Sequence, residues 1–162
     1  MTITLVDRRM IAQTEEVRKS SHDPHRQVGV VIANGASIIS TGANEPPHSL
    51  ALTPAVSRRL IAEDPDWKYF VLEHAERNAI FSAWRSGAQV AGSTMYGTLF
   101  PCADCARAIA AAGIRRLVVP KPGGDSLRDR KWAEHYQYAG RILNLARVTV
   151  DFFDPAEFSS FE

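Results

Sequence analysis

The only two thiols of the chain stand three positions apart, in the segment FPCADC (residues 100–105). We predict that Cys102 and Cys105 share one side of the first turn of a helix, because residues i and i+3 are neighbours there. The partial positive charge of a helix N-terminus favours thiolates. The pair therefore has three interpretations: two small apolar core residues, a dithiol redox pair, or half of a tetrahedral metal site.

A histidine that opens an earlier predicted helix offers a third metal ligand. His74 is followed two positions later by Glu76. His-x-Glu alone is weak evidence, because chance matches are common. Together with a strand and then Pro-Cys-x-x-Cys at the next helix start, it forms the signature of zinc-dependent nucleobase deaminases. We predict that His74, Cys102 and Cys105 bind one catalytic Zn²⁺ per subunit.

The same signature predicts a role for the carboxylate. Zinc held by one imidazole and two thiolates keeps a fourth position for water and lowers the pKa of that water. We predict that Glu76 is the catalytic acid–base, since it stands beside a ligand without being one and could carry a proton to the substrate. A structural zinc site in an interaction module is the non-enzyme alternative, although it would need a fourth protein ligand.

The elements that must position these residues alternate between helices and strands. Apolar periodicity predicts helices over residues 7–19, from about 74 to 87, 102–113 and 130–146. Runs rich in β-branched residues predict strands over 28–33, 37–41, 93–100, 115–120 and 146–153, the first two joined as a hairpin. Residues 41–54 contain three prolines and predict a long functional loop. The alternation predicts an α/β fold.

Composition limits the classes of function. The 162 residues suit a single domain (1–162), and 19 Lys and Arg against 18 Asp and Glu leave a formal charge of +1. This balance favours a small substrate over nucleic acid. Arg128, Arg130 and Lys131 are interrupted by acids and predict a solvated face. We expect no membrane association, and a cytoplasmic protein with reduced thiols, since the N-terminus lacks the apolar core of a signal peptide.

Longer stretches of the chain resemble the cytidine and deoxycytidylate deaminase superfamily, in particular its deoxycytidylate-deaminase-like branch. The resemblance rests on SHDPHRQVGVVIA (21–33), TGAN (41–44), HAERNAI (74–80), TLFPCADCARAIAAAGIRRLVV (98–119) and, more weakly, RILNLARVTV (141–150). It implies a three-layer α/β/α sandwich around a five-stranded mixed sheet. It also implies one catalytic zinc per subunit and a homo-oligomer.

The resemblance further implies a set of substrate-binding residues. Asn44 would hydrogen-bond the sugar or the ring of the substrate, and Val28 would help to wall the base pocket. Ser21 and Arg26 would lie near a 5′-phosphate. The loop after Asn44 departs from the family pattern, because it reads TGANEPPHS where the family commonly reads TGYNGFPRG.

This departure bears on the substrate. His48 stands where the family has arginine, and His22 where lysine is usual. Fixed positive charge is thereby lost where a phosphate would sit. The candidates that remain to bind a phosphate are these two histidines, when protonated, and Arg26 or Lys121. We predict hydrolytic deamination of a cytosine-type nucleotide, with dCMP giving dUMP and ammonia. The alternative substrates are unphosphorylated: deoxycytidine, cytosine or guanine.

Trp67, Tyr69 and Phe70 form an aromatic cluster shortly before His74. We expect these large side chains to pack in the core rather than to stack on a base.

Overall fold

The computed structural model describes residues 3–123 and 126–158 and contains a five-stranded mixed sheet. The strands are β1 (Gly29–Asn34), β2 (Ser37–Ala43), β3 (Thr94–Gly97), β4 (Arg116–Pro120) and β5 (Thr149–Phe153), in the spatial order β2-β1-β3-β4-β5. β1 runs antiparallel to both β2 and β3, whereas β3, β4 and β5 are parallel. The hairpin makes the antiparallel part, and helical crossovers make the parallel part.

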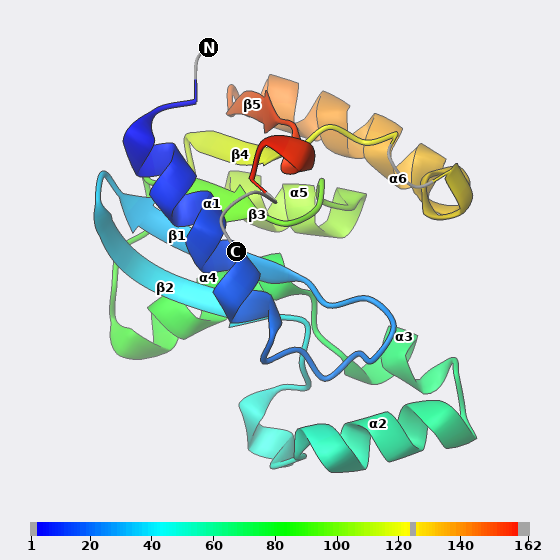
Figure 1. Ribbon diagram of the computed structural model, residues 1–162. Coiled ribbons are helices and arrows are strands. Elements are labelled where there is room, and N and C mark those ends of the chain that lie inside the picture. The colour runs from blue at the N-terminus through cyan, green and yellow to red at the C-terminus, as the bar shows by residue number, and fades with distance from the viewer. Residues whose placement is uncertain (1–2, 124–125, 159–162) are drawn as a thin grey trace.

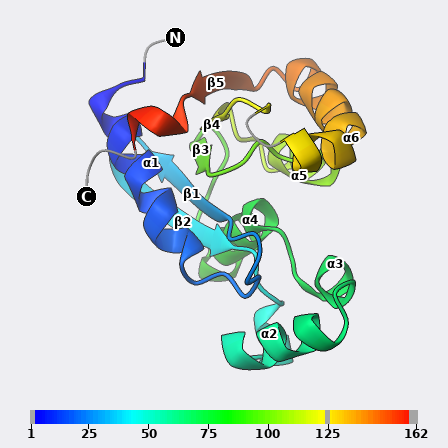
Figure 2. The ribbon, with the colours of Figure 1, turned by 45° about the vertical axis from the view of Figure 1, so that its right-hand side comes forward.

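Helices cover both faces of this sheet. They are α1 (Leu5–Arg18), α2 (Pro54–Glu63), α3 (Trp67–Val71), α4 (Ala75–Ser86), α5 (Ala103–Ala111) and α6 (Ser126–Leu145), with short 3₁₀ turns at His48–Leu50 and Pro155–Glu157. Figures 1 and 2 show α1 on one face and α4 and α5 on the other, while α2 and α3 lie together beyond the strands. The predicted three-layer α/β/α sandwich is confirmed.

The two faces of β1 belong to two separate hydrophobic clusters. Val30 and Ile32 point toward the cluster that includes α4, α5 and α6. Val31 points the other way, toward Met10 and Ile11 of α1. Successive side chains of a strand alternate between faces, so a run of four apolar residues is buried on both sides. This explains why the strand reads as a continuous apolar run in the sequence.

A glycine allows α4 to lie directly on β2. A Cβ atom at Gly42 would stand 2.3 Å from the carbonyl oxygen of Ala75 and 2.4 Å from the amide nitrogen of Ala79. No other residue fits this contact without moving the backbone. The close approach places the start of α4, and therefore His74, beside the end of β2.

The predicted helices and strands are confirmed, with boundary shifts of a few residues, except that β3 is shorter and that α2 and α3 were not predicted. Pro54 was interpreted as a loop residue, but it occupies the first turn of α2, where its fixed φ suits a helix. The hydroxyl of Thr53 caps this helix by accepting from the amide of Val56 at 3.3 Å. Across the described ranges of the chain, no helix has the length and apolarity to cross a bilayer.

The expected burial of the aromatic cluster is wrong. Trp67 is half-buried, Tyr69 is exposed, and the Phe70 side chain is 86% exposed. The short helix α3 carries all three residues and stands apart from the sheet, so its apolar side chains have no layer to pack against. Tyr69 instead lines the cavity described below.

A buried ion-pair network joins α1 to the parallel strands. Asp7 is 1% exposed and accepts hydrogen bonds from Arg116 at 2.6 Å and from the Tyr96 hydroxyl at 2.8 Å. Arg116 also pairs with Asp151 at 2.6 Å. Burial alone would raise the pKa of Asp7, but the hydrogen bonds from Arg116, Thr4 and Tyr96 outweigh it and lower that pKa. The network therefore stabilises the fold at neutral pH and loses strength as the pH falls below the ordinary carboxyl pKa of 3.8.

Replacing Arg116 by methionine should destabilise the fold by about 3–5 kcal/mol, because it leaves the buried Asp7 carboxylate without its cation. Urea unfolding at pH 7 with saturating zinc measures this loss. Arg115→Met is the matched control, since Arg115 is the exposed neighbour, and it should change stability by less than about 0.5 kcal/mol. Equal losses of unfolding free energy in both variants would show that the ion-pair network does not stabilise the fold.

Candidate metal centre and substrate cavity

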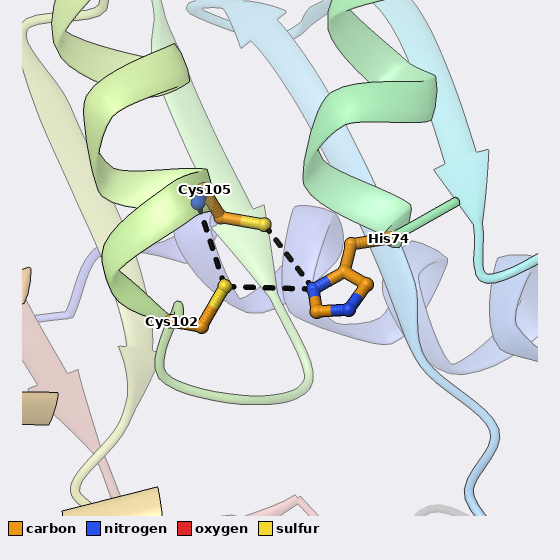
Figure 3. Close-up of side chains that lie close together, drawn as sticks. All are labelled: His74, Cys102 and Cys105. Carbon is orange, nitrogen blue, oxygen red and sulfur yellow. Dashed lines mark hydrogen bonds between the residues drawn. The ribbon is translucent and has the colours of Figure 1, made fainter. Parts of the chain in front are cut away.

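Three potential metal ligands meet where two helices begin. His74 is the N-cap residue of α4, Cys102 is the N-cap residue of α5, and Cys105 lies in the first turn of α5. The Nδ1 atom of His74 is 3.5 Å from Sγ of Cys102 and 3.4 Å from Sγ of Cys105. Figure 3 shows the imidazole and both thiols turned toward one another from the two helices.

These distances fit a zinc ion. Zinc–sulfur bonds of about 2.3 Å and zinc–nitrogen bonds of about 2.0 Å at the tetrahedral angle place nitrogen and sulfur ligands about 3.5 Å apart. The three ligand atoms of the cluster all lie within 4.8 Å of one another. One imidazole and two thiolates could therefore hold zinc and leave its fourth position open, as in catalytic rather than structural sites.

The protein environment favours the ligand form of one thiol. The amide of Cys105 donates to Sγ of Cys102 at 3.5 Å, and both helix N-termini direct positive dipole ends at the cluster. Hydrogen bonds from Cys105 and His74 lower the pKa of the Cys102 thiol to about 4 against the opposing effect of burial. Cys105 shows the opposite direction, because it donates to Cys102 and is buried, and both raise its pKa.

Glu76 lies in the first turn of α4, beside this cluster. Its side chain is only 7% exposed, and burial raises the pKa of its carboxyl group, although the nearby imidazolium of His74 opposes the shift. A carboxyl group with a raised pKa inside a cavity has the properties of a proton carrier.

A clamp around one asparagine holds the start of α4 in place. The side-chain amide of Asn78 donates to the carbonyl oxygens of Ala43 at 2.9 Å and Glu45 at 3.1 Å. The amide of Glu73 donates to the carbonyl of Glu45 at 3.0 Å, so the residues before α4 pair with the chain that leaves β2. Sequence analysis did not identify Asn78. The feature that could have indicated it is a polar residue one helical turn after His74.

A cavity of about 380 Å³ opens over the cluster. Its walls combine the helix starts, the loop before β1, α3 and the first half of α6. The lining residues used below are Asp23, Arg26, Val28, Asn44, Lys68, Tyr69, His74, Glu76, Cys102, Arg128, Lys131, Trp132 and Tyr136. This volume suits a small ligand such as a nucleotide.

Three of the four predicted substrate-binding residues line this cavity: Asn44, Val28 and Arg26. Oδ1 of Asn44 accepts from the Ser21 hydroxyl at 2.6 Å and from the amide of Val28 at 2.8 Å. Its Nδ2 donates to the carbonyl of Arg26 at 2.8 Å, which leaves one N–H for a ligand. Ser21 is fully buried and does not line the cavity, so its contact is with Asn44.

The two histidines considered for phosphate binding lie elsewhere. Nδ1 of His22 is 2.7 Å from the Ser57 hydroxyl, and burial together with the charge of Arg58 lowers the pKa of the imidazole. A neutral, buried His22 has no charge to offer an anion. His48 is exposed in a 3₁₀ turn, and neither histidine lines the cavity.

Helix α6 supplies a wall that sequence analysis did not assign to the site. Trp132 packs edge-on against the imidazole of His74 at 6.3 Å between ring centroids, and Tyr136 packs against Phe100 at 5.7 Å. Arg128 and Lys131, interpreted from the sequence as part of a solvated face, also line the cavity. The spacing of 128, 131, 132 and 136 is that of one helix face, but only the tertiary packing shows where this face points.

The α/β/α sandwich with a His–Cys–Cys cluster where two helices begin matches a known family. A model described as the cytidine and deoxycytidylate deaminase zinc-binding region matches residues 6–121. The chain therefore belongs to the cytidine and deoxycytidylate deaminase family, as the sequence predicted, and its cluster could hold the zinc ion of that family.

Individual relatives support this assignment. The chain is 34% identical to human deoxycytidylate deaminase over 137 residues, covering 83% of this chain and 72% of that protein. It is also 34% identical over 143 residues to an uncharacterized deaminase encoded in the luxG 3′ region of Aliivibrio fischeri, covering 88% and 90% of the two chains. The dCMP deaminase of cyanophage S-TIM5, solved with dCMP and dUMP, superposes with a TM-score of 0.69 at 20% identity, covering 94% and 100% of the chains, and supports the fold.

Removing any one of the three ligands should abolish stoichiometric zinc binding. We expect about one zinc per chain in the wild type and much less in His74→Ala, Cys102→Ala and Cys105→Ala, because two ligands hold zinc poorly. Elemental analysis of protein purified without chelator measures this content. His48→Ala is the control, since it removes an exposed histidine and should keep the metal. Full zinc in a ligand variant would show that the ligand set is wrong.

Proposed function

We propose that this protein is a zinc-dependent hydrolase that deaminates a cytosine-type nucleotide, with dCMP converted to dUMP and ammonia. The observation that carries the proposal is the position of the buried Glu76 carboxyl beside a three-ligand cluster, at the base of a nucleotide-sized cavity. The relatives named deoxycytidylate deaminase support the choice of dCMP as the first substrate to test.

The proposed roles divide the chemistry among four residues. His74, Cys102 and Cys105 would hold zinc, which would supply a water of lowered pKa at its open position. Water oxygen adds to C4 of the ring, the bond from C4 to the amino nitrogen breaks, and ammonia leaves. Glu76 takes the proton from water, delivers it to the ring nitrogen N3, and then transfers a proton to the departing amino group. Its raised pKa suits a group that must alternate between both protonation states.

Around the ring, Val28 and Trp132 provide apolar walls, and the remaining N–H of Asn44 is directed to the sugar or the base. Ser21 acts as a positioning residue, because it holds the Asn44 amide in this orientation. The half-buried site limits the access of bulk water, which strengthens hydrogen bonds to the substrate.

We also propose that residues 1–162 fold as one domain that assembles into a homo-oligomer in the cytoplasm. Large apolar side chains on the outer surface of α4 support the oligomer, since Trp84 is 77% exposed and Phe81 is exposed one turn before it. The two free thiols support a reducing compartment, because the zinc ligand role requires them reduced.

Glu76→Gln should keep about one zinc per chain and lower kcat by about 10²–10⁴-fold, because the amide cannot carry the proton. Ammonia release from dCMP measures the rate, and elemental analysis measures the metal. Turnover near that of the wild type would remove Glu76 from the mechanism.

Comparing substrates side by side tests the assignment to nucleotides. Ammonia release is measured from dCMP, cytidylate, deoxycytidine, cytosine and guanine, with Glu76→Gln as the blank. The highest kcat/KM for dCMP would support the proposal. A higher kcat/KM for an unphosphorylated compound would support deamination but assign a different substrate. No ammonia release from any compound would favour a structural zinc site.

A further inference from the structure

We propose that the first half of α6 forms the subsite that selects a 5′-monophosphate, with Lys131 and Arg128 as the residues that bind it together with Arg26. This inference rests on the proposed function, since it assigns the phosphate end of the same nucleotide. Lys131 and Arg128 lie outside the metal-binding motifs and outside the loop that follows Asn44.

The charges around the cavity favour an anion. Four cationic side chains line it, namely Arg26, Lys68, Arg128 and Lys131, against two carboxylates, Asp23 and Glu76. The formal charge of the whole chain is only +1, so this excess is local. A phosphate monoester carries close to two negative charges at neutral pH and is bound by Lys and Arg.

The lysine of α3 already forms an ion pair within the protein. Lys68 Nζ pairs with Asp23 at 2.9 Å, and both side chains are largely buried. This pair ties α3 to the loop before β1, and its charges cancel within the wall. Lys68 therefore contributes to the shape of the cavity more than to its positive charge.

Lys131 of α6 lies near the same aromatic ring as Lys68, since their Nζ atoms are 4.2 Å and 5.4 Å from the centroid of Tyr69, but its charge is not paired in the same way. Nζ of Lys131 donates to the Tyr69 hydroxyl at 2.9 Å. In the part of the chain that the structure describes, no carboxylate pairs with Lys131. A neutral phenol orients the ammonium without neutralising it, so two of its three N–H bonds remain available to a phosphate oxygen.

Arg128 of α6 and Arg26 of the loop before β1 both line the cavity, as does Tyr136. Burial raises the pKa of the Tyr136 phenol, whereas the charges of both arginines lower that pKa. Arg128 pairs with Asp129 at 3.0 Å, so this pair adds little net charge to the wall. Guanidinium N–H groups are strong donors to phosphate, and among the residues that the structure describes no carboxylate pairs with the charge of Lys131.

This arrangement accounts for the unusual loop after Asn44. The loop lacks the arginine of the family pattern, His48 lies outside the cavity, and His22 is buried and neutral. Positive charge is supplied from α6 instead. The preference for a phosphorylated substrate would then depend on a helix that is distant from this loop in the sequence.

Lys131→Met tests the subsite with a matched control on the same helix. Methionine keeps an unbranched apolar stem beside Tyr69 and removes only the ammonium group. We expect the ratio of kcat/KM for dCMP to that for deoxycytidine to fall by about 10–100-fold, mainly through KM for dCMP. Arg128→Met should lower the same ratio, and Lys131→Arg should restore most of it. Arg130→Met should leave it unchanged, since Arg130 is exposed on α6 and does not line the cavity.

A binding measurement separates this inference from the proposed function. Calorimetry compares dUMP with deoxyuridine on zinc-loaded wild type and Lys131→Met, and needs no turnover. A loss of dUMP affinity alone in the variant would support the subsite even if no deamination were found. Deamination that discriminates between dCMP and deoxycytidine equally well in wild type, Lys131→Met and Arg128→Met would overturn the subsite while leaving the proposed function intact.

Discussion

The arrangement of this protein depends on bringing two helix N-termini to one point. His74 and Cys102 are 28 positions apart in the chain, yet their ligand atoms are 3.5 Å apart. This requires α4 to lie directly on β2, which Gly42 permits, and α5 to start immediately after the central strand β3. The two helix dipoles then add to the same positive potential, which favours a thiolate before any metal is bound.

Chemistry and recognition are placed on different parts of the fold. The proposed metal ligands and Glu76 stand at the starts of helices that are packed against the sheet, so their geometry is fixed by a buried core. The cavity walls come from the loop before β1, from α3 and from α6. Surface segments of this kind can change in sequence without disturbing the core.

The charged side chains show the same division between the fold and the cavity. Two buried carboxylates are paired with cations, Asp7 with Arg116 and Asp23 with Lys68. Lys131, by contrast, contacts a phenol rather than a carboxylate, and its charge faces the cavity. A buried pair stabilises only the fold, whereas an oriented cation at the mouth of a cavity attracts an anionic ligand.

The α/β class, most element positions and the motif of His74, Glu76, Cys102 and Cys105 could be predicted from the sequence, because they depend on local periodicity and on spacing within a helix turn. The sequence did not predict α2 and α3, because a proline in the first turn of a helix cannot be distinguished by sequence pattern from a proline in a loop. Nor did it show that Lys131 belongs to the site. Side-chain type sets what a residue can bind, but only long-range packing decides which helix face meets the cavity.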